Sequence, residues 1–67
     1  MDTIKRVYDL AEENDISLYQ LAKDSGISLA TIKAAEKRSG QLKIDTIERI
    51  CEALGITLSA FFVERES

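Results

Sequence analysis

Apolar residues recur in this sequence at intervals of three and four positions, and that spacing constrains the fold more than any other feature. The first such segment spans residues 3–14. Within it, Ile4, Val7, Tyr8 and Ala11 would share one face of a helix. No run of alternating β-branched residues is long enough to indicate a sheet. The pattern therefore predicts an all-α fold of five short helices.

Capping residues mark where the second and third helices begin and end. Ser17 opens a capping-box pattern with Gln20, so a helix of about two turns should follow. Gly26 can adopt the left-handed conformation that ends it. Ser28 is then a good N-cap for a third helix over residues 29–38.

The last two helices are predicted from the same signals. A second capping-box pattern begins at Asp45 and precedes an apolar stripe that Gly55 closes. Residues 56–62 fit a short fifth helix with Thr57 or Ser59 near its start. We expect the helices to bury one common core, consisting of Val7, Leu10, Leu21, Ile32, Ile47, Ile50, Leu54 and one of Phe61 and Phe62.

The length of 67 residues leaves room for one domain, which we expect to span residues 1–67. The single cysteine, Cys51, is expected to be a small buried hydrophobe, and its lack of a partner fits a reducing cytosol. No apolar stretch follows the basic residues at the start, so no signal peptide is visible. The longest uncharged run, residues 53–63, is too short to cross a membrane. We therefore expect a cytoplasmic protein.

The charges are unevenly distributed along the chain, whose net charge is −3. Residues 17–43 hold five basic and two acidic side chains, a net charge of +3, whereas the other four basic and ten acidic residues sum to −6. The basic residues of the segment are Lys23, Lys33, Lys37, Arg38 and Lys43. A locally positive segment within an acidic chain indicates one surface suited to an anion.

The stretch from 21 to 32 predicts a helix-turn-helix. Two predicted helices flank a turn of three or four residues that contains Gly26, and Ala22 is small enough for the second helix to cross closely. In such a motif the second helix can enter the major groove of DNA.

Several pieces of the sequence match one known family in order and spacing. They are Leu21-Ala22, Ser25-Gly26-Ile27-Ser28, Thr31-Ile32, Glu36 and the run from Ile50 to Leu58. On these residues the chain resembles the phage-repressor and Cro-like (XRE-type) helix-turn-helix family. The resemblance implies a lambda-repressor-like DNA-binding domain, with the helix-turn-helix at about 17–38 and the recognition helix at about 29–38. It also implies a repressor-like, sequence-specific transcriptional regulator of double-stranded DNA.

The expected DNA contacts lie at two helix starts, along the third helix and just after it. Lys37 and Arg38 are suited to bind phosphates. The alternative is that they only stabilise the C-terminus of the helix through its dipole. Lys33 would read a guanine edge or merely face water, and Thr31 would contact a phosphate or a thymine methyl. The full expected set is Ser17, Tyr19, Ser28, Leu29, Ala30, Thr31, Lys33, Lys37, Arg38 and Lys43.

The apolar start of the third helix leaves a second interpretation open. Leu29 and Ala30 offer no side-chain hydrogen bonds to bases, and the isoelectric point is about 4.8. The alternative is an antitoxin-like or other protein-interaction module with weak or lost DNA binding. A homodimer is expected in the first interpretation, because the adjacent Phe61, Phe62 and Val63 cannot all face one small core.

Catalysis is not expected from this composition. The chain has no histidine, one cysteine and no glycine-rich phosphate loop. We therefore expect no catalytic residues, no metal and no cofactor.

Overall fold

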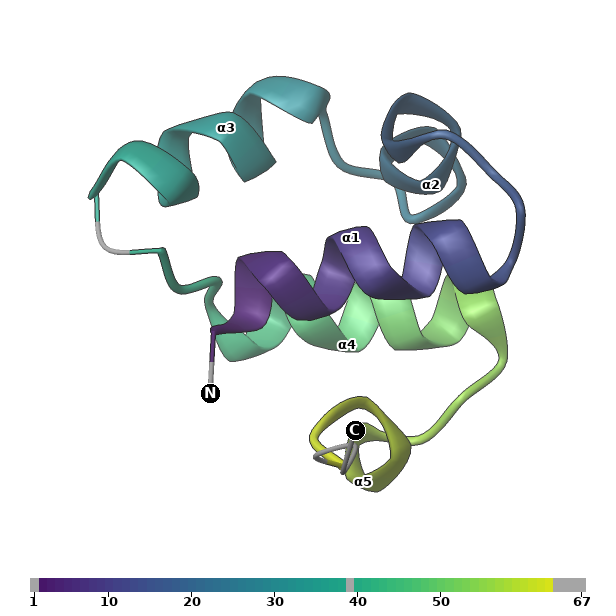
Figure 1. Cartoon of the computed structure of the whole chain (residues 1–67). Helices are drawn as coiled ribbons and strands as arrows, with labels where there is room; N and C mark the ends of the chain where they lie inside the picture. Colours follow the sequence, from purple (N-terminus) through teal and green to yellow (C-terminus); the bar gives the residue numbers. More distant parts are fainter. Residues whose placement is uncertain (1, 39, 64–67) are drawn as a thin grey trace.

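The computed structural model describes residues 2–38 and 40–63 of the chain. Over this part it contains five α-helices and no strand, namely α1 (Thr3–Glu13), α2 (Leu18–Asp24), α3 (Leu29–Arg38), α4 (Ile44–Leu54) and α5 (Leu58–Phe61). Figure 1 shows α2 and α3 at one end of the molecule and α5 at the other. The predicted all-α fold of five short helices is confirmed. None of the described helices is long and apolar enough to cross a membrane.

Short polar side chains begin four of the helices. Asp2, Ser17, Ser28 and Thr57 each accept a hydrogen bond from the backbone N–H three residues further on, at 3.0–3.2 Å. Each cap satisfies an N–H that has no partner inside its helix. Only half of the capping box at Ser17 forms, because the Gln20 side-chain amide donates to Asp24 Oδ1 at 2.7 Å instead.

The predicted capping box at Asp45 is wrong. α4 begins two residues earlier, at Ile44, with Lys43 at the N-cap position and no side-chain cap. Asp45 is therefore already helical, and its carboxylate lies 3.8 Å from Arg49 Nε on the next turn. An acidic side chain in the first turn still stabilises a helix through its interaction with the dipole. The end of α4 is as predicted, with Gly55 at φ +69°.

One core unites the helices. Its buried apolar members are Ile4, Val7, Leu10, Ala11, Leu21, Ala22, Ile32, Ala35, Leu42, Ile47, Ile50, Cys51 and Phe61. Leu54 was predicted to be in this core but is only half-buried and packs against the edge of the core, because it is the last residue of α4. Cys51 is buried as expected, and this burial raises the pKa of its thiol.

Arg6 connects α1 to the end of α5. Its guanidinium donates from Nε to the Phe61 carbonyl oxygen at 2.6 Å and from Nη2 to the Ala60 carbonyl oxygen at 3.0 Å. Its Nη1 lies 3.8 Å from a Glu13 carboxylate oxygen. A cation is well placed at a helix C-terminus, where free carbonyls accumulate negative charge. Arg6 therefore fixes the orientation of α5 against α1.

The two adjacent phenylalanines provide a test of where the core ends. Phe61 is 0% exposed and Phe62 is 38% exposed. We expect Phe61→Ala to lower the free energy of unfolding by about 3–5 kcal/mol, because it leaves a cavity in a small core. The matched control, Phe62→Ala, should cost less than about 1 kcal/mol. Urea denaturation followed by circular dichroism at low protein concentration measures both, and equal losses would contradict this core boundary.

Candidate nucleic-acid interface

α2 and α3 are joined by four residues, 25–28, that reverse the chain. Gly26 has φ +73°, and the Ile27 N–H donates to the Ala22 carbonyl oxygen at 3.0 Å. The Ser25 hydroxyl donates to the Leu21 carbonyl oxygen at 2.7 Å. Ala22 is almost completely buried. Gly26 therefore has the predicted left-handed conformation, and Ala22 is a small residue of the core.

α3, the predicted recognition helix, packs against the rest of the domain along one narrow stripe. It buries only Ile32 and Ala35. With about 3.6 residues per turn, the opposite side of the helix carries Ala30, Ala34 and Lys37, all of which are exposed. α3 thus presents an outward side of small residues with a basic residue in its last turn.

The first turn of α3 is occupied by capping contacts. The Ser28 hydroxyl accepts from the Thr31 N–H at 3.2 Å and lies 3.0 Å from the Thr31 hydroxyl. Both residues are exposed, so each hydroxyl retains capacity for an outside partner. Leu29, by contrast, is half-buried.

Lys33 lies on the flank of α3 that faces α1. Its Nζ donates to the Tyr8 hydroxyl oxygen at 2.9 Å and lies 5.5 Å from the centre of the Tyr8 ring. The Glu36 carboxylate is 4.0 Å away. The hydrogen bond to Tyr8 and, to a lesser extent, the charge of Glu36 raise the pKa of Lys33. Lys33 therefore remains protonated at neutral pH.

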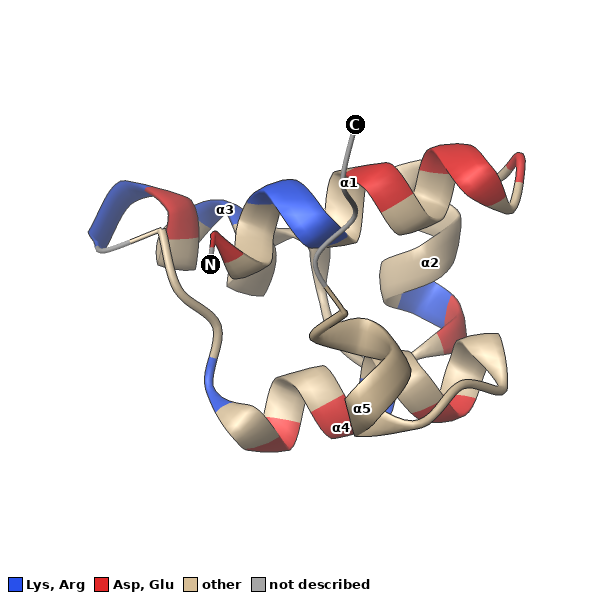
Figure 2. Cartoon of the chain, turned by 60° about the horizontal axis from the view of Figure 1, so that its bottom comes forward, with Lys and Arg blue, Asp and Glu red and all other residues tan. Residues whose placement is uncertain are grey.

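The other basic residues of the predicted site lie at the end of α3 and at the start of α4. Lys37 and Arg38 form its last turn, and the exposed Lys43 precedes α4. Figure 2 shows the basic end of α3 apart from the acidic second half of α1, and a second basic position at the start of α4, close to acidic residues of that helix. The segment that carries Lys43 is anchored to α1, because the Leu42 N–H donates to the Thr3 hydroxyl at 2.8 Å.

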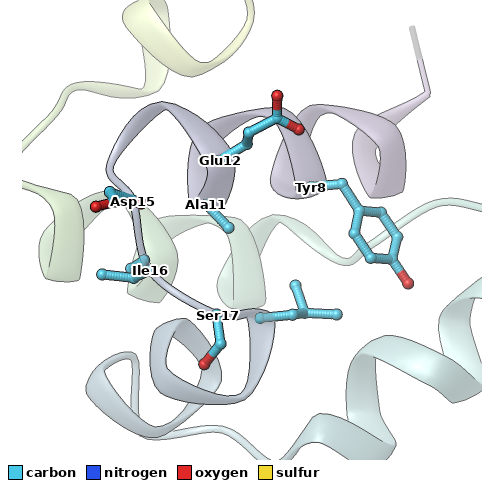
Figure 3. A pocket seen from close by; sticks show the side chains of 7 residues that line it. Tyr8, Ala11, Glu12, Asp15, Ile16 and Ser17 are labelled. Atoms are coloured by element: carbon cyan, nitrogen blue, oxygen red, sulfur yellow. The ribbon is translucent and has the colours of Figure 1, made fainter.

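A shallow pocket of about 440 Å³ lies between the end of α1 and the start of α2. It is lined by Tyr8, Ala11, Glu12, Asp15, Ile16, Ser17 and Leu18 (Figure 3). The Ser17 hydroxyl caps α2. Tyr19, in the first turn of α2, is 63% exposed. The two carboxylates disfavour an anion inside the pocket. Any phosphate contact of Ser17 must therefore come from outside the pocket.

The structure brings part of the predicted site together. Ser28, Thr31, Lys37 and Arg38 follow one another along α3, and Lys43 comes shortly after it. Tyr8 was not among the predicted site residues, because its spacing placed it in the apolar stripe of the first helix. The signal that could have found it is the hydroxyl at the edge of that stripe, beside a predicted recognition helix.

A four-residue turn between two packed helices, with the second helix largely exposed, defines a helix-turn-helix domain. Residues 6–63 match a family model described as the Cro/C1-type HTH DNA-binding domain. The chain belongs to this family, which confirms the resemblance seen in the sequence and makes DNA binding its function. The family is typically non-catalytic. No curated protein and no solved structure gave a significant match.

The turn itself is open to a direct test. A methyl group at Gly26 would meet only Arg49 Nη1, at 3.7 Å, so the cost of Gly26→Ala should come from the positive φ rather than from a clash. We expect a loss of about 1–2 kcal/mol in the free energy of unfolding. Gly26→Asn should cost less, because asparagine tolerates the left-handed region. Equal losses in urea denaturation would show that backbone conformation is not the cause.

Proposed function

We propose that this protein is a transcriptional regulator that inserts α3 into the major groove of double-stranded DNA and binds as a homodimer. The observation that carries the proposal is the exposure of α3 together with the basic group at its end. The small residues Ala30 and Ala34 let the helix approach the groove floor closely. Their methyl groups are suited to apolar contact with thymine.

Affinity in this proposal comes mainly from the DNA backbone. Lys37, Arg38 and Lys43 would meet phosphates where α3 leaves the groove, and such contacts supply affinity without sequence preference. The anchoring of Leu42 to Thr3 supports this role, because it limits the freedom of the segment that carries Lys43. On the other side of the groove, Ser17 and Tyr19 at the start of α2 would provide further contacts.

Sequence preference would rest on few positions. Thr31 is the remaining polar side chain in the first turn of α3, and its hydroxyl is shared with Ser28. A good base contact contributes roughly 1–3 kcal/mol of discrimination. A dimer doubles the number of such contacts by binding two half-sites. A bound dimer would also exclude other proteins from its site, which is the action of a repressor.

The dimer surface lies at the end of α5. Phe62 and Val63 are exposed there, and Leu58 is at the margin of exposure. Phe61, which was expected in this surface, is fully buried and contributes its ring to the core instead. Arg6 holds the α5 carbonyls, so the apolar surface has a fixed orientation relative to α3. A symmetric pair could thus present two recognition helices about 34 Å apart.

The backbone contacts can be tested by removing charge. We expect the double variant Lys37→Gln/Arg38→Gln to weaken binding to a duplex selected from random DNA and to a scrambled duplex by the same factor. The slope of log affinity against log salt should fall by about two charges' worth, near 1.8. Fluorescence anisotropy across salt concentrations measures this change. The control variant Lys5→Gln/Arg49→Gln removes the same charge from α1 and α4 and should leave the slope unchanged. If the unaltered protein binds neither duplex at low salt, DNA binding is excluded and the protein-interaction alternative replaces it.

The dimer is tested by sedimentation at tens of micromolar protein. We expect a dimer that Phe62→Asp dissociates, because a buried carboxylate would be unpaired at the centre of the interface. Ile44→Asp places the same charge at another exposed apolar position, on α4, and should leave the dimer intact. A monomer at every concentration, with one molecule bound per duplex, would contradict the proposed assembly.

A further inference from the structure

We propose that Tyr8 and Lys33 together bind one phosphate of the DNA backbone, which brings α1 into the interface. The inference rests on the proposed function, since it adds a contact to the same DNA-binding surface. It assigns a role to Tyr8, a residue that family resemblance and charge pattern both leave unassigned.

The hydrogen bond between the two side chains leaves a donor on each. Lys33 Nζ donates to the Tyr8 oxygen at 2.9 Å, so the phenol proton is free to donate elsewhere. The ammonium has three N–H groups and uses one of them for Tyr8. Two donors therefore lie 2.9 Å apart, a separation that lets them reach two oxygens of one phosphate.

The surroundings of the pair keep it charged and ordered. The Glu36 carboxylate lies 4.0 Å from Lys33 Nζ, beyond hydrogen-bonding distance, and both side chains are about half exposed. Glu36 therefore leaves N–H groups of the ammonium open to an outside anion. The Tyr8 ring packs against the core, so α1 fixes the position of the hydroxyl, and Figure 3 shows it directed away from the acidic pocket.

The position of the pair favours a phosphate over a base. Lys33 lies on the flank of α3 toward α1, whereas the outward side carries Ala30 and Ala34. With the outward side against the base edges, a flank of the helix faces the wall of the groove, and that wall is made of phosphates. Two donors without a carboxylate acceptor between them match such an anion.

The test compares Tyr8→Phe, Lys33→Met and the double variant by anisotropy on the selected and scrambled duplexes across salt. Tyr8→Phe keeps the ring and removes only the hydroxyl. Each single variant should weaken binding to both duplexes by roughly threefold to tenfold, the equivalent of one lost hydrogen bond. Lys33→Met should also lower the salt slope by about 0.9, whereas Tyr8→Phe should leave it unchanged. The double variant should lose less than the product of the two single losses, because both groups hold one phosphate.

A second measurement locates the contact on DNA. Duplexes that carry one neutral methylphosphonate at successive positions should include one position that weakens binding of the unaltered protein but not of Lys33→Met. Lys5→Met, on the exposed side of α1, is the control and should behave as the unaltered protein in every duplex.

Three results would overturn the inference. Unchanged or tighter binding by Tyr8→Phe would show that the hydroxyl withholds Lys33 from DNA or plays no part. A loss confined to one base pair of the selected duplex would make Lys33 a base-reading residue. Failure of the unaltered protein to bind either duplex would overturn the proposed function as well, which distinguishes it from the first two results.

Discussion

The attachment of α3 through Ile32 and Ala35 is the constraint on which the rest of the site depends. These are the two buried residues of a ten-residue helix, which packs against α1 and α2. So narrow a stripe gives α3 a defined orientation while leaving most of its surface in solvent. It also means that α3 has little stability of its own, because short helices depend on packing. The cap at Ser28 and the turn at Gly26 therefore matter as much as the buried pair.

An acidic protein can still bind a polyanion when its charges are segregated. Here many carboxylates lie on the second half of α1 and along α4, whereas Lys37 and Arg38 lie in the last turn of α3 (Figure 2). Fields from exposed charges decay within about 10 Å at ordinary salt concentrations, so the local group dominates at a DNA contact. The acidic remainder would oppose non-specific adsorption to DNA in any other orientation. Net charge alone is thus a poor guide to the partner of this chain.

Much of the fold could be predicted from the sequence, because local chemistry sets it. The caps at Ser17 and Ser28 and the left-handed Gly26 follow from side-chain and backbone preferences that act within a few residues. The start of α4 could not be placed by the same reasoning, since Asp45 is equally suited to a cap and to a first turn. Contacts between distant helices were also out of reach. The bonds from Arg6 to α5 and from Lys33 to Tyr8 join residues 25 to 55 positions apart, and no local pattern encodes them.

The central claim is that α3 and the segment after it form the surface that meets DNA. The most direct measurement is a titration of the isotope-labelled protein with the selected duplex, followed through its backbone amide resonances. The account predicts that the largest shifts fall in residues 28–38 and 40–44, with the second half of α4 nearly unchanged. Large shifts on α4 with α3 unaffected would contradict the account.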